Sequence, residues 1–298
     1  MTYRGRFAPS PTGPLHFGSL VAAVGSYLDA KHHHGVWLIR MEDLDTPRCV
    51  PGAADDILRT LAAFGLQSDE PVIYQSQRSH AYEEALHRLK ILGMSYPCAC
   101  TRKEIEDSGL HGIEGPVYAG ICRNGLAPGR KARAWRVRTD FSPALIEFND
   151  DLQGRIEQNL ADEIGDFVVK RADGLFAYQL AVVVDDAFQS ITHVVRGADL
   201  INSTPRQIFL QRLLDFAMPA YQHLPVAINP AGEKLSKQTR ATAVVPGDRA
   251  TLLSVLQFLD QQPPEHLCAA PVRDILAWAI ENWQPERLRG CQHISTTN

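Results

Sequence analysis

The sequence contains no long hydrophobic run, which excludes a helix that spans a membrane. A bilayer-crossing helix needs about 20 consecutive apolar residues, and no apolar stretch among these 298 residues approaches that length. The opening residues Met-Thr-Tyr-Arg-Gly do not resemble a signal peptide either. We therefore expect a soluble protein that has no membrane partner.

Cysteine is scarce, and an excess of positive charge is missing. The 6 cysteines stand at irregular positions, which disfavours a disulfide framework and is typical of a protein from the reducing cytoplasm. The formal net charge is −4, so an RNA partner would have to meet a local basic patch. Hydrophobic residues make up 45% of the chain and charged residues 21%, values that are typical of a globular protein with one or two domains.

The stretch from Arg6 to Leu20 has the most informative pattern. A short apolar run enters it, three prolines, a glycine, a serine and a threonine fall within six residues, and a helical pattern leaves it. This order predicts a strand, a rigid loop and a helix N-terminus, where free amides and the helix dipole favour an anion. Gly18 and Ser19 permit close approach, and His16 could donate to a phosphate oxygen. An ordinary strand–helix connection without a ligand is the alternative.

Acidic residues follow the second predicted strand. Val36–Met41 is predicted to be a buried strand, and Glu42 and Asp45 come directly after it. Thr46-Pro47 predicts a helix start that Asp45 or Thr46 caps. Ligands of open parallel sheets bind outside the carboxyl ends of the strands, so Glu42 is expected to face the same crevice as the first loop. The alternation of strands and helices up to residue 93 predicts an α/β fold with a doubly wound, Rossmann-type parallel sheet.

The alternation breaks after residue 93, where thiols gather. Cys98, Cys100 and Cys122 lie in a segment with many glycines, and three cysteines leave a tetrahedral zinc ion one ligand short. Spacing alone allows three candidates for the fourth ligand, of which the first is the usual choice by ligand chemistry: His111, Glu114 and Tyr118. Unpaired cytosolic thiols under a surface loop are the alternative.

The second half of the chain is expected to return to the sheet. Asp173-Gly174 predicts a hairpin turn, and we expect core strands over Gln179–Val184 and Ile191–Val195. The latter strand delivers Arg196 to the presumed crevice. A capped helix is predicted from Thr204 through Leu214.

A polar loop and a helical tail follow. Lys234 and Lys237 flank a serine in a loop that could close over a polyphosphate, although charged loops are usually only solvated. The patterns over Ala250–Leu259 and Val272–Trp283 predict a small C-terminal helical appendage, and the residues after Pro285 are expected to be frayed.

Taken together, three motifs resemble the class I aminoacyl-tRNA synthetases of the glutamyl type. Pro-Ser-Pro-Thr-Gly-Pro-Leu-His16-Phe-Gly18 is similar to their HIGH signature, and Lys234-Leu-Ser-Lys237 is similar to their KMSKS loop. The third motif is Leu38-Ile-Arg-Met-Glu-Asp-Leu-Asp45, and the match continues through Val184-Asp-Asp186 and Thr192-His-Val-Val-Arg196-Gly, over about the first 240 residues.

Three departures make the resemblance more specific. The chain stops where those enzymes continue into a helical domain that reads the glutamate anticodon, Ser19 replaces a second histidine, and Arg196-Gly-Ala-Asp replaces Arg-Gly-Glu-Asp. With the Cys-x-Cys, Tyr and Cys pattern, these features resemble the family of truncated paralogues that act on tRNA(Asp). In that family ATP-activated glutamate is esterified onto queuosine at the anticodon wobble position.

The resemblance assigns an organisation and roles to matching positions of this chain. It implies a catalytic core over residues 1–93 and 166–242, an inserted zinc-binding subdomain over 94–165 and a helical appendage over 243–298. Glutamate would be held by Arg6, Phe7, Ala8, Pro9, Ser10, Glu42, Tyr178 and Arg196. ATP would be held by His16, Gly18, Ser19, Lys234, Ser236 and Lys237, of which His16 and Lys237 would be catalytic. Zinc would be bound by Cys98, Cys100, Tyr118 and Cys122.

The same resemblance implies the partners of the chain. They are L-glutamate, ATP with Mg²⁺, one structural zinc ion and a tRNA(Asp) that carries queuosine, and we expect a cytoplasmic monomer. The alternatives are a minimal synthetase that charges the 3′ end of tRNA(Glu), a nucleotidyltransferase with a similar loop, and a zinc-containing RNA-binding paralogue without catalysis.

Overall fold

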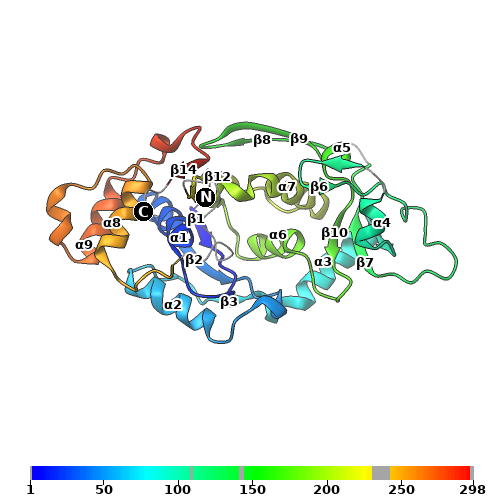
Figure 1. The fold of residues 1–298 in the computed structure, drawn as a ribbon, viewed down its shortest axis with the longest axis horizontal. Coiled ribbons are helices and arrows are strands. Elements are labelled where there is room, and N and C mark those ends of the chain that lie inside the picture. Colours follow the sequence, from blue (N-terminus) through cyan, green and yellow to red (C-terminus); the bar gives the residue numbers. More distant parts are fainter. Residues whose placement is uncertain (1, 108–109, 141–143, 230–241, 296–298) are drawn as a thin grey trace.

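Parallel strands occupy the centre of the molecule (Figure 1). The computed structural model describes residues 2–107, 110–140, 144–229 and 242–295. Strands β1 (Arg4–Phe7), β2 (Val36–Met41) and β3 (Ile73–Tyr74) form a parallel sheet in that order. Strands β11 (His193–Gly197) and β12 (Ala220–Leu224) are also parallel. The Thr192 amide, just before β11, donates to the Arg4 carbonyl of β1 (3.0 Å). The sheet that contains β1 therefore lies beside the pair β11 and β12.

Helices cover both faces of these strands. Trp37 and Ile39 of β2 pack in one buried cluster with α1 (Phe17–His32), whereas Leu38 packs in a second cluster on the other face. Successive side chains of a strand point to opposite faces of the sheet. The continuous apolar run in β2 therefore indicates that both faces of the sheet are covered at this strand. The second cluster contains α3 (Ser79–Ile91), α6 (Tyr178–Phe188) and α7 (Thr204–Leu214). This is the doubly wound arrangement that the alternation of elements predicts.

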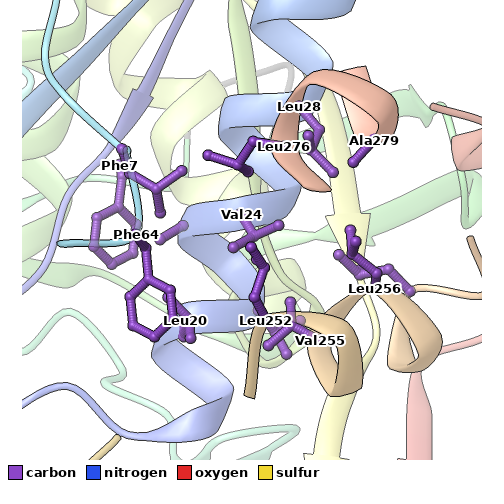
Figure 2. Close-up of a cluster of buried hydrophobic side chains, with 14 of the residues drawn as sticks. Phe7, Leu20, Val24, Leu28, Phe64, Leu252, Val255, Leu256, Leu276 and Ala279 are labelled. Atoms are coloured by element: carbon purple, nitrogen blue, oxygen red, sulfur yellow. The ribbon is translucent and has the colours of Figure 1, made fainter. Parts of the chain in front are cut away.

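The C-terminal helices share the core of the first half of the chain. Helices α8 (Arg249–Phe258) and α9 (Val272–Glu281) pack against α1, and their buried leucines meet Val24 and Leu28 of α1 (Figure 2). Helix α2 (Ala53–Ala63) contributes to the same cluster. The domain boundaries given above stay a prediction, but the appendage is not a separate core.

The segment after residue 93 is mainly antiparallel. Strands β4 (Ser95–Cys98), β7 (Ala134–Val137) and β10 (Phe167–Lys170) form one sheet in the order β10-β7-β4. The same segment of the chain also contains α4 (Arg102–Glu106), β5 (His111–Gly112), β6 (Gly115–Pro116) and α5 (Leu160–Glu163). The hairpin of β8 (Leu145–Asp150) and β9 (Gly154–Asn159) returns to the central strands, because β8 pairs with β12 at Asp150 and Tyr221.

Three local predictions were wrong. Gln179–Val184 is not a strand but part of α6, whose residues from Leu180 to Asp186 are all buried. An apolar run that is buried on every side has no periodicity that distinguishes a strand from a helix. Thr46-Pro47 opens only a single 3₁₀ turn, which Asp45 does not cap.

The third error concerns the end of the chain. After Pro285, residues up to 295 are ordered into the fold, since β14 (His293–Ser295) pairs in parallel with β13 (Val226–Ile228). The indole of Trp283 anchors the preceding segment by donating to Asp29 of α1 (2.8 Å). None of the described helices is long and apolar enough to cross a bilayer.

Candidate functional site

A cavity of about 530 Å³ opens at the carboxyl ends of β1, β2 and β11. All eight residues that the resemblance assigns to glutamate line it, and so do three of those assigned to ATP: His16, Gly18 and Ser19. Lys234, Ser236 and Lys237 lie outside the described residues. Loops that are far apart in sequence therefore converge here, as expected from the position of ligands in open parallel sheets.

The first loop is fixed to the segment that follows β2. The amide of Glu42 donates to the Pro9 carbonyl (2.9 Å), and the amide of Val50 donates to the Pro11 carbonyl (2.9 Å). A loop with three prolines has few conformations to lose on folding, and these two hydrogen bonds set it against the acidic segment. Glu42 thus faces the same cavity as the loop, as predicted.

His16 caps helix α1 with its side chain. Its Nδ1 accepts a hydrogen bond from the Ser19 amide (3.3 Å), and its Nε2 lies 2.9 Å from the Ser19 hydroxyl oxygen. An acceptor Nδ1 places the proton of a neutral imidazole on Nε2. The helix N-terminus and Gly18 form part of the cavity wall, which is an arrangement that suits a phosphate group.

A buried ionic network underlies the floor of the cavity. Arg6 binds Asp186 through Nε (3.1 Å) and Nη2 (3.3 Å), and Nη1 of Arg40 donates to the same carboxylate (2.7 Å). Nη2 of Arg40 also contacts Glu42 (3.3 Å). Burial alone would raise the pKa of Asp186, but the two guanidinium groups hold it below its usual range. The carboxylate that Arg6 binds is therefore one of the chain's own, which the motif pattern did not indicate.

Glu42 has the opposite electrostatic balance. Its side chain is 9% exposed, and burial raises its pKa although Arg40 and Arg6 act to lower it. A cationic ligand group next to this carboxylate would favour its ionised form. Glu42 is therefore suited to an ammonium group.

Arg196 is a buried cation that has no carboxylate partner within the described part of the chain. It is 5% exposed, and none of the ion pairs between described residues includes it. Its Nε donates to His223 (3.1 Å), Nη1 donates to the hydroxyl of Tyr178 (3.3 Å), and Nη2 donates to Thr204 (2.7 Å). A guanidinium has five N–H groups, so one N–H on each terminal nitrogen is left for a ligand. Because an uncompensated buried charge is costly, the cavity favours an anion at this point.

The cysteines converge in the antiparallel segment. The Sγ atoms of Cys98, Cys100 and Cys122 lie within 4.8 Å of one another, and this is the group of potential metal ligands found among the described residues. The hydroxyl of Tyr118 is 3.4 Å from Cys98 and 3.5 Å from Cys100, and the two sulfurs of Cys100 and Cys122 are 3.6 Å apart. A tetrahedral zinc with Zn–S of about 2.3 Å and Zn–O of about 2.0 Å requires about 3.8 Å between sulfurs and about 3.5 Å from sulfur to oxygen.

These distances favour Tyr118 over His111 as the fourth donor of such a site. His111, the choice from ligand chemistry alone, lies on the exposed strand β5 and does not belong to the cluster. The guanidinium of Arg136 stacks over the Tyr118 ring at 4.1 Å and holds the ring in place. The donor set therefore fits a zinc ion.

Several residues of the site were not indicated by local sequence patterns. Asp150 and His223 belong to none of the motifs, Arg40 lies within one but was given no role, and Thr204 was interpreted only as a helix start. They belong to strands and helices that lie up to 146 residues from their partners, so only the tertiary structure brings them to the cavity.

Comparison with known proteins agrees with this geometry. Residues 2–249 match the family model "tRNA synthetases class I (E and Q), catalytic domain". A glutamyl-Q tRNA(Asp) synthetase of Dechloromonas aromatica is 64% identical over 284 residues, which cover 94% of both chains. The protein of the same name from Thiobacillus denitrificans is 58% identical over 95% of this chain and 94% of the relative.

Solved structures show the same fold. A glutamate-tRNA synthetase of Elizabethkingia anophelis aligns with a TM-score of 0.77 at 24% identity, covering 99% of this chain and 68% of that chain. A methionyl-tRNA synthetase of Mycobacterium tuberculosis aligns with a TM-score of 0.58 at 12% identity, covering 87% and 62%. The chain has the class I synthetase fold, and it belongs to the glutamyl-Q tRNA(Asp) synthetases, which are ligases of the aminoacyl-tRNA synthetase family.

Proposed function

We propose that the chain activates L-glutamate with ATP and transfers the glutamyl group to queuosine in tRNA(Asp). The observation that carries this proposal is Arg196, a buried guanidinium that faces a cavity without a carboxylate partner among the described residues. The names of the relatives support the same reaction.

The polar groups of the cavity suit the three charges of glutamate. The two N–H groups left on Arg196 can fork the side-chain carboxylate, with the Tyr178 hydroxyl beside them. Glu42 can pair with the ammonium group. Arg6 and the backbone from Phe7 to Ser10 line the remaining wall, and there they can meet the α-carboxylate.

We assign the ATP phosphates to the other side of the first loop. The N-terminus of α1 with Gly18 and Ser19 would face phosphate oxygens. The N–H on Nε2 of His16, which now points at the Ser19 hydroxyl (2.9 Å), would turn to donate to one of them when ATP binds. Lys234, Ser236 and Lys237 are proposed from the sequence to close on the polyphosphate and to neutralise the departing pyrophosphate. Mg²⁺, when bound, would add charge neutralisation on the phosphates.

The reaction needs no protein nucleophile. A carboxylate oxygen of glutamate attacks the α-phosphorus of ATP, the bond to pyrophosphate breaks, and glutamyl-adenylate forms. A hydroxyl of the queuosine ring then attacks the activated carbonyl, AMP leaves, and the hydroxyl proton is released. Alignment and charge stabilisation supply the rate enhancement in both steps. Bases that are splayed from an RNA loop are accessible to such a cavity.

Transfer of labelled glutamate to tRNA tests this function. With ATP, label is expected on tRNA(Asp) from cells that make queuosine and not on tRNA from cells that cannot make it. Label in tRNA(Glu) from both pools would instead establish a minimal glutamyl-tRNA synthetase. An absence of label on both pools, with no glutamate-dependent ATP–pyrophosphate exchange, would contradict catalysis.

Zinc content gives a prediction that does not depend on activity. We expect about one zinc ion per chain, which Cys98→Ser removes because the tetrahedral set loses a thiolate. Elemental analysis of the purified protein after dialysis measures it. Cys268→Ser, at an exposed thiol outside the cluster, is the matched control and should keep the metal.

A second pair of variants tests the fourth ligand. Tyr118→Phe should weaken zinc retention against a chelator, whereas His111→Ala should leave it unchanged. Retention in Tyr118→Phe together with loss in His111→Ala would show that the ligand set is wrong.

A further inference from the structure

Arg196 is held from behind by a buried chain of polar groups that no sequence motif indicates. Asp150 is 3% exposed, and the side chains of His223 and Thr204 are fully buried. Oδ2 of Asp150 lies 2.6 Å from Nδ1 of His223, and Nε2 of His223 accepts from Nε of Arg196 at 3.1 Å. We propose that Asp150 and His223 are positioning residues that orient the Arg196 guanidinium toward glutamate. The proposal rests on the glutamate-binding role given to Arg196 above.

The hydrogen-bond chemistry fixes the direction of this chain. Arginine has donors only, so Nε2 of His223 must be the acceptor in its contact with Arg196. The proton of the neutral ring is then on Nδ1, where it points at the Asp150 carboxylate. The order Asp150, His223, Arg196 therefore has one consistent assignment of protons, and the ring orientation is set by the carboxylate, as for histidines that a carboxylate orients elsewhere.

Asp150 is itself held rigidly where two strands meet. Its Oδ1 accepts from the amides of Leu152 (3.1 Å), Gln153 (2.9 Å) and His223 (3.2 Å). Asp150 ends β8 at its pairing with β12, and His223 is part of β12. The returning hairpin of β8 and β9 therefore carries the anchor, and β12 carries the histidine, to the back of the glutamate cavity.

The protonation states agree with this geometry. Burial lowers the pKa of His223, and Arg196 lowers it further against the effect of Asp150. Burial alone would raise the pKa of Asp150, but the bond from His223 and the amides hold it below its usual range. At neutral pH the pair is thus a carboxylate and a neutral imidazole, which can accept from Arg196.

The anchors leave one side of the guanidinium open. Nε is bound to His223 and one N–H of Nη2 is bound to Thr204, whose hydroxyl oxygen is also 3.2 Å from Nε2 of His223. His223 and Thr204 therefore hold the edge formed by Nε and Nη2. The edge formed by Nη1 and the second N–H of Nη2 remains for a carboxylate. Without His223 the guanidinium could rotate about its last torsions, and a bidentate contact would lose its alignment.

Two substitutions of His223 separate positioning from simple packing. In His223→Asn the amide nitrogen reaches the place of Nδ1, so the contact with Asp150 is kept and the acceptor for Arg196 is lost. In His223→Gln the terminal amide reaches the place of Nε2, where its oxygen can accept from Arg196. Kinetics of ATP–pyrophosphate exchange with the full chain give the KM for glutamate and the KM for ATP separately.

We expect His223→Asn to raise the KM for glutamate about 10- to 100-fold while the KM for ATP changes less than about threefold. His223→Gln should recover most of the glutamate affinity. Equal effects of the two variants, or equal changes in both KM values, would overturn the positioning role. His193→Asn, at a half-buried histidine of β11 outside the cavity, is the control and should leave both values near those of the unmodified chain.

A coupling measurement covers the other outcomes. In an Arg196→Lys background the His223→Asn change should have little further effect on the KM for glutamate, since lysine lacks the Nε donor. If the effects of the two substitutions on this KM were fully additive, the positioning role of His223 would be contradicted. If His223→Asn does not fold, Asp150→Asn, which removes the charge that orients the ring, carries the same expectation. If Arg196→Met leaves the KM for glutamate unchanged, the glutamate site itself is wrong. If Arg196→Met raises the KM for glutamate but the His223 and Asp150 variants leave it unchanged, the glutamate site is correct and only the positioning role of Asp150 and His223 is wrong.

Discussion

Replacement of Arg196 by methionine is expected to raise the KM for glutamate about 30-fold or more, while the KM for ATP changes little. The guanidinium is 5% exposed and has no ion-pair partner among the described residues, so a bound carboxylate would be largely desolvated there. Removing one member of such a buried charge pair costs about 2–5 kcal/mol, which corresponds to a 30-fold to several-thousandfold loss. Methionine keeps much of the apolar stem, which limits the loss of packing.

Glutamate-dependent ATP–pyrophosphate exchange measures this effect, and two variants make it specific. Arg196→Lys keeps the charge but not the fork, so its KM for glutamate should fall between those of the original chain and the methionine variant. Arg155→Met changes an exposed arginine of β9 and should have no effect. A rise in the KM for ATP alone would place Arg196 in the nucleotide site and would contradict the assignment.

The sequence predicts the residues that line the cavity but not the residues that hold them in place. Arg196 follows an apolar run that reads as a strand, and Glu42 follows another, so the rule that ligands gather at the carboxyl ends of parallel strands brings both to one crevice. Asp150 and His223 obey no such rule. They meet because β8 pairs with β12, a contact between segments 73 residues apart, and local propensity contains no information about that pairing.

The same division applies to the elements themselves. The helix from Thr204 through Leu214 is confirmed at both bounds, because a proline in the first turn marks its start. The predicted cap is wrong, since neither Ser203 nor Thr204 caps the helix with its side chain. The prediction of a strand over Gln179–Val184 was wrong because this part of α6 is buried along most of its length, and such a run lacks the polar face that reveals a helix. Strand β14 was missed because it has three residues and depends entirely on pairing with β13.

The Cys cluster shows a third kind of limit. Spacing predicts that three thiols gather, and this is confirmed. It does not identify the fourth donor, because a tyrosine is an unusual zinc ligand and a nearby histidine is a common one. The choice of Tyr118 depends on oxygen–sulfur distances of 3.4 and 3.5 Å, which no linear pattern contains.

The second large effect concerns stability. Asp186→Ala is expected to lower the free energy of unfolding by about 3–5 kcal/mol, because it leaves two buried guanidinium groups, those of Arg6 and Arg40, without their shared carboxylate. Arg40 is fully buried and would keep Glu42 as an ion-pair partner at the longer distance of 3.3 Å and a hydrogen bond to the neutral amide of Gln189 (2.9 Å). Urea unfolding of both proteins at neutral pH measures the difference. Asp56→Ala, which removes an exposed ion pair with Arg59 on α2, is the control and should change stability by less than about 0.5 kcal/mol.

The pH dependence of that difference identifies its electrostatic origin. The pKa of Asp186 is lowered in the folded chain, whereas the pKa of an aspartate in an unfolded chain is about 3.9. A depressed folded pKa contributes stability that is fully present above the unfolded pKa and is lost as the pH falls through the folded pKa. The gap between the original chain and Asp186→Ala should therefore stay constant between about pH 5 and 8 and narrow below about pH 4. A gap that is independent of pH down to the acid transition would mean that Asp186 stabilises the fold by packing and not by its charge.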